Sequence, residues 1–228
     1  MTSARLAVVT PAIDVGAIDV AGTLAGLGDP RVTVEHHFLA AGPACIDNEA
    51  DIAACRPGLL ALARRLAAGH CAGLVINCMY DPCLDELREL VPVPVFGCAQ
   101  TAMSVATALG RPFGIVDVLN LAEPMALEQG HAMMASLLAR YGAGAACVSY
   151  RAIDVPILTL YDCRPLTLKA LERAVGDMAN DGAASILLGC TGLAGLSAEL
   201  QAACSRLNRP ITVIEPLRTT VSVACSML

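Results

Sequence analysis

Residues 74–82 read LVINCMYDP: an apolar run of strand type ends on a cysteine, and a turn follows at once. Residues 186–192, ILLGCTG, repeat the same order of apolar run, cysteine and turn. Free cysteine is usually a small buried hydrophobe, so a thiol at the junction of a strand and a turn calls for an explanation. Ligands of open α/β sheets bind beyond the carboxyl ends of the strands. Cys78 and Cys190 are therefore candidates to meet a ligand.

The chain alternates between apolar runs without period-two spacing and Ala- and Leu-rich segments with helical spacing. Continuous apolar strands of this kind are typical of parallel sheets covered by helices on both faces, so the sequence predicts an α/β fold. The expected strands are residues 5–10, 32–39, 73–78, 93–98, 113–118, 184–190 and 211–216. The expected helices are residues 50–68, 83–90, 99–109, 121–141, 165–181 and 193–207.

The two halves of the chain also resemble each other. Three pairs of segments match in the same order: 5–10 with 111–117, 74–78 with 186–190, and 93–109 with 209–228. Chance similarity between apolar strands is the alternative, but a shared order is harder to obtain by accident than shared hydrophobicity. We expect two pseudo-symmetric lobes, each a mostly parallel sheet covered by helices, with the active site in the cleft between them. The expected lobes are residues 1–98 plus 216–228, which hold Cys78, and residues 99–215, which hold Cys190.

Composition excludes several classes of protein. The net charge is −6, Trp is absent and aromatic residues make up 3% of the chain, so neither a basic surface nor a stacking platform for nucleic acid is expected. Mean hydropathy is +0.61, yet the apolar residues come in short blocks broken by Gly, Pro and charges, so no membrane segment is expected. The expected partner is a small molecule, and the apolar excess favours a homo-oligomer.

The N-terminal stretch MTSARLAVVTPAID lacks the pattern of a secretory signal, so the expected location is the cytoplasm. The chain has eleven cysteines, an odd number at irregular spacings, so disulfides are not expected in that compartment. His36–His37 and His70–Cys71 stand apart from other ligand candidates, so no metal site is expected. The glycines of GCTGLAG do not have the spacing of a nucleotide-binding loop, so no nucleotide cofactor is expected.

Most of the thiols are expected to pack as small apolar groups. Nine belong to this set: Cys45, Cys55, Cys71, Cys83, Cys98, Cys147, Cys163, Cys204 and Cys225. Cys78 and Cys190 differ because each ends a strand and precedes a turn and a helix start. Backbone N–H groups and a helix N-terminus at such a point can lower the pKa of a thiol from about 8.5, which makes a thiolate base or nucleophile available near neutral pH.

Three short motifs carry a resemblance to a known family. They are G-P-x-x-I at Gly42, Pro43 and Ile46, C-x-x-D-P at Cys78, Asp81 and Pro82, and L-G-C-x-G at Leu188, Gly189, Cys190 and Gly192. Because both cysteine-containing motifs occur in this order along the chain, the whole chain resembles the hydantoin racemase family within the aspartate/glutamate racemase superfamily. Met79-Tyr80 replaces the Asn-Thr that tends to follow the first cysteine of amino-acid racemases, which favours the hydantoin branch.

The resemblance implies racemisation without a cofactor. One cysteine thiolate removes a proton from the carbon next to a carbonyl, and the other thiol returns a proton to the opposite face. The enolate oxygen would be stabilised by the N–H groups that follow the two cysteines and by the hydroxyls of Thr10 and Thr191. The candidate catalytic residues are Cys78 and Cys190. The candidate substrate-binding residues are Thr10, Pro11, Met79, Tyr80, Asp117, Val118, Thr191 and Gly192.

The sequence departs from the family at two turns. Residues 10–13 read TPAI where hydantoin racemases usually have N-P-N followed by Thr or Ser, and Asp117-Val118 stands where the family often has two threonines. Asp117 either binds the substrate, through the ring N–H groups of a hydantoin or the ammonium of an amino acid, or caps the next helix as an exposed acid. Met79 and Tyr80 either line a side-chain pocket or pack the base of a helix.

Three functions therefore stay open. The first is a racemase of a 5-substituted hydantoin. The second is an aspartate/glutamate-type amino-acid racemase, or another isomerase or decarboxylase of the superfamily that acts on a small carboxylic acid. The third is a two-lobed protein that binds a small molecule without catalysis, although binding alone gives no reason for two cysteines at equivalent strand ends.

Overall fold

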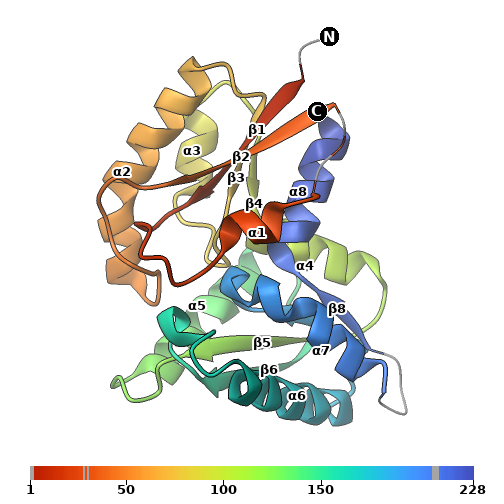
Figure 1. Ribbon diagram of the computed structural model, residues 1–228. Helices are drawn as coiled ribbons and strands as arrows, with labels where there is room; N and C mark the ends of the chain where they lie inside the picture. Colours follow the sequence, from red (N-terminus) through yellow and green to blue (C-terminus); the bar gives the residue numbers. More distant parts are fainter. Residues whose placement is uncertain (1–2, 28, 30, 207–210) are drawn as a thin grey trace. The chain divides into compact units, whose positions relative to one another are not determined.

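The computed structural model describes residues 3–27, 29, 31–206 and 211–228. The chain forms two compact units (Figure 1). Unit 1 comprises Met1–Thr101 and Leu217–Leu228, and unit 2 comprises Ala102–Pro216. The chain therefore leaves unit 1 early in one helix and returns to it at the start of the last helix.

Unit 1 contains a parallel four-stranded sheet of order β2-β1-β3-β4. Its strands are β1 (Ala4–Thr10), β2 (Val32–Phe38), β3 (Gly73–Ile76) and β4 (Val95–Gly97). Its helices are α1 (Val20–Leu24), α2 (Glu49–Ala68), α3 (Leu84–Leu90) and α8 (Pro216–Met227), and α4 (Cys98–Ala108) begins in this unit. Helices α2 and α3 lie on one side of the sheet and α8 on the other (Figure 1).

Unit 2 contains a second parallel sheet of order β6-β5-β7-β8. Its strands are β5 (Phe113–Leu119), β6 (Cys147–Asp154), β7 (Ser185–Leu188) and β8 (Thr212–Ile214). Its helices are α5 (Ala126–Arg140), α6 (Arg164–Asn180) and α7 (Ser197–Cys204), with short 3-10 helices at Ile157–Thr159 and Thr191–Leu196.

The two sheets have the same topology and the same register at their centres. In unit 1, Val9 of β1 lies opposite Ile76 of β3. In unit 2, Val116 of β5 lies opposite Leu188 of β7. The prediction of an α/β fold with two pseudo-symmetric lobes is confirmed, and the internal repeat in the sequence reflects a repeated strand order.

Each sheet buries one face against two helices. In unit 1, β1 and β3 pack with α2 and α3 through residues that include Leu59 and Leu87, both 0% exposed. In unit 2, β5 and β7 pack with α6 and α7 through residues that include Leu171 and Leu200. The continuous apolar strands predict this packing of helices on the sheet, because the strands of a parallel sheet are apolar where helices cover them.

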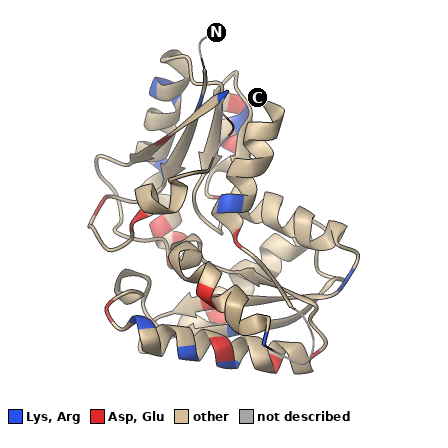
Figure 2. Cartoon of the chain, turned by 45° about the vertical axis from the view of Figure 1, so that its right-hand side comes forward, with Lys and Arg blue, Asp and Glu red and all other residues tan. Residues whose placement is uncertain are grey.

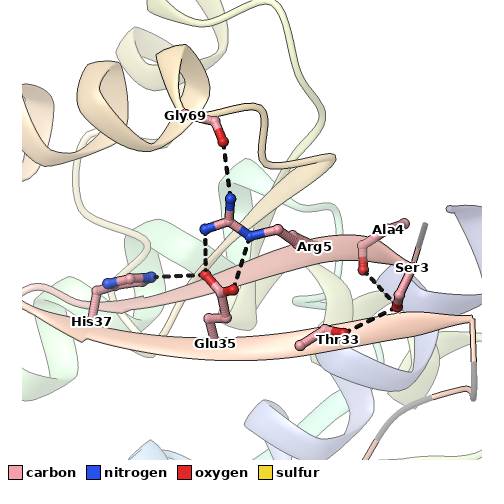
Figure 3. A network of polar contacts seen from close by, with 7 residues as sticks. All are labelled: Ser3, Ala4, Arg5, Thr33, Glu35, His37 and Gly69. Atoms are coloured by element: carbon pink, nitrogen blue, oxygen red, sulfur yellow. Dashed lines mark hydrogen bonds and ion pairs between the residues drawn. The ribbon is translucent and has the colours of Figure 1, made fainter.

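The edge strand β2 is tied to β1 by a polar network (Figure 3). Arg5 donates two hydrogen bonds of 2.8 Å to the carboxylate of Glu35 and one of 3.0 Å to the carbonyl of Gly69, at the end of α2. His37 lies 3.8 Å from the same carboxylate. Glu35 and His37 share one face of β2, so the intervening His36 points to the opposite face.

All seven expected strands are present, and the expected helices differ mainly at their ends. Helix α5 begins at residue 126 rather than 121 because a turn follows β5. The expected helix 193–207 is a 3-10 turn followed by α7, and its last residue lies outside the described residues. Strand β6 and helices α1 and α8 were not expected. Strand β6 reads CVSYRAID and is mostly half-buried or exposed, so it lacks the continuous apolar pattern of the inner strands.

Charged residues lie mainly on helices and loops, with Lys and Arg interspersed among Asp and Glu (Figure 2). The strands are largely uncharged in the same view. Among the helices of the described residues, none combines the length and the apolar character needed to cross a bilayer.

Helix α6 offers a matched pair of leucines to test the core of unit 2. Leu171 is 0% exposed and Leu166 is 65% exposed. We expect Leu171→Ala to lower the free energy of unfolding by about 2–5 kcal/mol, because it removes buried apolar surface and leaves a cavity. Leu166→Ala should change it by less than about 0.5 kcal/mol. Urea unfolding followed by circular dichroism measures both, and equal losses would contradict this description of the core.

Candidate active site

Cys78 lies just beyond the carboxyl end of β3. The N–H of Asn77 still donates to the carbonyl of Val9 (2.9 Å), which continues the pairing of β3 with β1. Beyond it the chain turns: the carbonyl of Cys78 accepts from the N–H of Asp81 (3.3 Å), and its sulfur accepts from the N–H of Tyr80 (3.4 Å). Only 8% of Cys78 is exposed.

Cys190 has the same local geometry in unit 2. The N–H of Gly189 donates to the carbonyl of Val116 (2.7 Å), in continuation of the pairing of β7 with β5. The carbonyl of Cys190 accepts from the N–H of Leu193 (3.2 Å), and its sulfur accepts from the N–H of Gly192 (3.3 Å). The two cysteines therefore occupy equivalent positions on equivalent turns.

An N–H group directed at sulfur stabilises negative charge on that sulfur. Both turns supply such a group from the residue two positions after the cysteine, Tyr80 in unit 1 and Gly192 in unit 2. These two N–H groups thus serve the thiols. Cys71 and Cys147 receive the same kind of contact from the residues two positions later. Cys78 and Cys190 are set apart by their equivalent places just beyond the ends of inner strands.

Asp81 holds the turn of Cys78 in place. It is 1% exposed, and its two carboxylate oxygens accept from the N–H groups of Ala99 (3.0 Å) and Gln100 (2.8 Å) in the first turn of α4. A carboxylate at a helix N-terminus satisfies unpaired N–H groups and interacts favourably with the helix dipole. A Cβ atom added at Gly97 would lie 2.4 Å from this carboxylate, so glycine is needed there.

The turn of Cys190 is held by different residues. The hydroxyl of Tyr161 donates to the carbonyl of Gly192 (2.8 Å), and Arg164 donates to the carbonyl of Gly195 (2.8 Å). Burial raises the pKa of Tyr161, which keeps the phenol protonated and able to donate. The backbone geometry of the two turns is shared, but the side chains that support it are not.

Thr10, the last residue of β1, joins a chain of three polar side chains. Its hydroxyl oxygen accepts from the side-chain amide of Asn77 (2.9 Å) and lies 2.8 Å from Nε2 of His36 on β2. Burial, and to a lesser degree the neighbouring His37, lowers the pKa of His36 to about 4. The imidazole is therefore neutral at pH 7.

Asp117 is buried within β5, and only 2% of it is exposed. One carboxylate oxygen accepts from the hydroxyl of Tyr150 on β6 (3.0 Å) and the other from the N–H of Val118 (2.8 Å). Burial, and to a lesser degree Asp117 itself, raises the pKa of Tyr150. The alternative of an exposed helix cap is wrong, because α5 begins nine residues later and Met125 precedes it.

The structure distributes the candidate residues between the carboxyl edges of the two sheets. At the edge of unit 1 are Thr10, Pro11, Cys78, Met79 and Tyr80. At the edge of unit 2 are Asp117, Val118, Cys190, Thr191 and Gly192. Met79 and Val118 are each 2% exposed, whereas Tyr80 is half-buried and packs against the core beneath α2 and α3.

The sequence does not indicate three polar residues near these edges as candidates for the site: His36, Asn77 and Tyr150. His36 was assigned to an isolated histidine pair, and Tyr150 lies on the unexpected strand β6. Asn77 could have been chosen from the sequence, because it is a polar residue directly before Cys78, where the second half of the chain has Gly189 before Cys190. Within the described part of the chain, no three His, Cys, Asp or Glu side chains are grouped so that they could hold a metal ion.

Known proteins resemble this chain over most of its length. The family model described as Asp/Glu/Hydantoin racemase matches residues 19–224. A hydantoin racemase from Rhizobium meliloti is 35% identical over 190 residues, which are 82% of this chain and 72% of that protein. The structure of an allantoin racemase from Klebsiella pneumoniae superposes with a TM-score of 0.85 at 29% identity, over 99% of this chain and 87% of that one.

An allantoin racemase from Pseudomonas fluorescens superposes with a TM-score of 0.82, over 98% of this chain and 90% of that one. Its sequence is 20% identical, so the likeness concerns the fold. The two-lobed α/β fold seen here is thus shared with racemases of solved structure.

Gly97→Ala tests the role of Asp81 in holding the turn of Cys78. We expect a loss of about 1–3 kcal/mol in the free energy of unfolding, because the added methyl group must displace a carboxylate fixed by two N–H groups. Gly144→Ala is the control, since a Cβ atom there meets nothing within 4 Å. Thermal unfolding of both variants gives the comparison, and an unperturbed Gly97→Ala protein would show that the Asp81 carboxylate is free to move.

Proposed function

We propose, on the premise that the chain belongs to the Asp/Glu/hydantoin racemase family, that it racemises a 5-substituted hydantoin without a cofactor. Family membership makes the chain an enzyme of the racemase type. The observation that carries the proposal is the repeated thiol turn: Cys78 and Cys190 lie just beyond the ends of equivalent strands, and each sulfur accepts a hydrogen bond from the N–H of the residue two positions later.

The proposed reaction moves protons only. One cysteine starts as thiolate and the other as thiol. The thiolate takes the proton from C5 of the hydantoin, the C–H electron pair moves into the ring as an enolate on the adjacent carbonyl oxygen, and the second thiol gives its proton to the opposite face of C5. The product is the other enantiomer, and the thiolate and thiol have changed places. No electron is gained or lost, and the reverse direction uses the same steps.

The charges of the candidate residues favour a neutral substrate. Asp117 is the one charged residue among the ten candidates, and it is a buried carboxylate. A substrate carboxylate near it would be repelled in a site of low dielectric. A hydantoin carries no carboxylate, and its two ring N–H groups can donate to acceptors. The relatives described above are named hydantoin racemase and allantoin racemase, which supports a substrate of the hydantoin type.

The second candidate is racemisation of a free amino acid. The observation in its favour is again Asp117, whose carboxylate could pair with an ammonium group. A homo-oligomeric state and a cytoplasmic location also belong to the proposal, and the first rests on the apolar composition of the chain.

Replacement of each candidate thiol tests the mechanism. We expect Cys78→Ser and Cys190→Ser each to reduce kcat for racemisation of (S)-5-benzylhydantoin by ~10²- to 10⁴-fold, because a serine hydroxyl is a far weaker acid and base. Polarimetry measures the rates. Cys163→Ser, at an exposed cysteine before α6, is the matched control and should retain full activity.

Two results would count against the proposal. Full racemisation by either single serine variant would contradict the use of two thiols. A wild-type enzyme that is inactive on hydantoins but racemises aspartate or glutamate would establish the second candidate.

A further inference from the structure

Both backbone groups of Gly192, in the short 3-10 helix that follows Cys190, are hydrogen-bonded. Its N–H donates to the sulfur of Cys190 (3.3 Å), and its carbonyl accepts from the hydroxyl of Tyr161 (2.8 Å). Tyr161 therefore holds the same residue whose N–H is directed at the thiol.

The carbonyl that Tyr161 binds belongs to the peptide group between Gly192 and Leu193. The N–H of this group donates to the carbonyl of Cys190 (3.2 Å). A peptide group is planar, so these two hydrogen bonds fix its orientation from both ends. Because glycine restricts its own backbone dihedrals less than other residues do, removal of the Tyr161 hydroxyl lets this plane rotate and turns the N–H of Gly192 away from the sulfur.

Tyr161 is itself held in place. It lies in the turn before α6 and packs against the core of unit 2. The guanidinium of Arg164 lies 5.6 Å from the centre of its ring. The same guanidinium donates to the carbonyl of Gly195 (2.8 Å) and forms an ion pair with Glu199 of α7. Arg164 thus joins the tyrosine ring to the far end of the 3-10 helix.

Gly195 provides the space that the phenol occupies. A Cβ atom at residue 195 would lie 2.6 Å from the hydroxyl oxygen of Tyr161 and 3.2 Å from the ring carbon that carries it. Any larger residue at 195 must therefore displace the hydroxyl. Tyr161 and Gly195 consequently form one matched contact.

The phenol of Tyr161 remains a donor near neutral pH. Burial raises the pKa of Tyr161, and the neighbouring Cys190 and Glu215 act in the same direction, against the opposing effects of Gly195 and Arg164. A neutral phenol has one proton to donate and places no charge beside the thiol. Its influence on the sulfur is exerted through the backbone.

We propose that Tyr161 is a positioning residue: its hydroxyl keeps the N–H of Gly192 directed at the sulfur of Cys190 and so favours the thiolate. This effect on the thiol belongs to unit 2 alone, whereas a role in proton transfer rests on the proposed function. The turn of Cys78 is anchored by Asp81 instead, so Cys78 should not respond to changes at residue 161.

The pH dependence of alkylation tests the effect on the thiol. The native enzyme is treated with iodoacetamide over a range of pH, and modification of Cys190 and Cys78 is followed by peptide mass spectrometry. The midpoint of each profile reports the pKa of that thiol, because the thiolate is the form that reacts. We expect Tyr161→Phe to move the midpoint of Cys190 to higher pH and to slow its alkylation below the midpoint roughly three- to tenfold, the value of one lost hydrogen bond. Cys78 should keep its midpoint.

Two further variants separate positioning from a general loss of structure. Tyr141→Phe is the matched control, because an arginine also lies over the ring of Tyr141, and it should leave both midpoints in place. Gly195→Ala displaces the phenol without removing its hydroxyl and should shift the midpoint of Cys190 as Tyr161→Phe does. The double variant should shift it no further than the larger single change, since both disrupt one contact.

An unchanged midpoint for Cys190 in Tyr161→Phe would overturn the proposal, as would an equal shift for Cys78. Kinetics provide the second readout: one limb of the pH profile of kcat/KM for (S)-5-benzylhydantoin should move to higher pH. A loss of the same size at every pH would make Tyr161 merely structural and would also overturn the proposal. A shifted midpoint in a protein whose wild type is inactive on hydantoins would support the effect on the thiol and refute the proposed function.

Discussion

The two candidate turns share one backbone interaction: the N–H group two residues after the cysteine points back at its sulfur. This contact exists because the strand ends two residues before the cysteine and the chain turns directly after it. Parallel strands bring such turns to one edge of the sheet, where N–H groups of turns and helix starts are available. Position relative to the strand, more than the identity of the neighbouring side chains, thus places Cys78 and Cys190 beside these N–H groups.

The repeat preserves backbone geometry while the supporting side chains diverge. Asp81 anchors one turn to the N-terminus of α4, and Tyr161 anchors the other through a carbonyl. Thr10 and Asp117 likewise share a position without sharing a side chain. Under the proposed function this difference is expected, because the two thiol turns must match in geometry whereas the side chains that support them need not.

Much of the fold could be predicted from the sequence, because apolar strands and their order are local signals. The two cysteine turns could be predicted for the same reason. The polar partners could not: His36 meets Thr10, and Tyr150 meets Asp117, only through the register between neighbouring strands. Strand β6 was also missed, since an edge strand with exposed polar residues has no continuous apolar run. Sequence patterns thus indicate which residues end a strand, but not which side chains meet across it.

The central claim is that two thiols act on opposite faces of C5 of a hydantoin. The most direct test is to follow the hydrogen at C5 during early turnover. Single-enantiomer 5-benzylhydantoin is incubated with the enzyme in deuterium oxide, and the deuterium content of each enantiomer is measured at low conversion against a reaction without enzyme. Two thiols on opposite faces predict deuterium in the product enantiomer and none in the recovered substrate, because one sulfur keeps the abstracted proton while the other delivers solvent deuterium. Product that retains the original hydrogen, or equal deuterium in both enantiomers, would contradict the account.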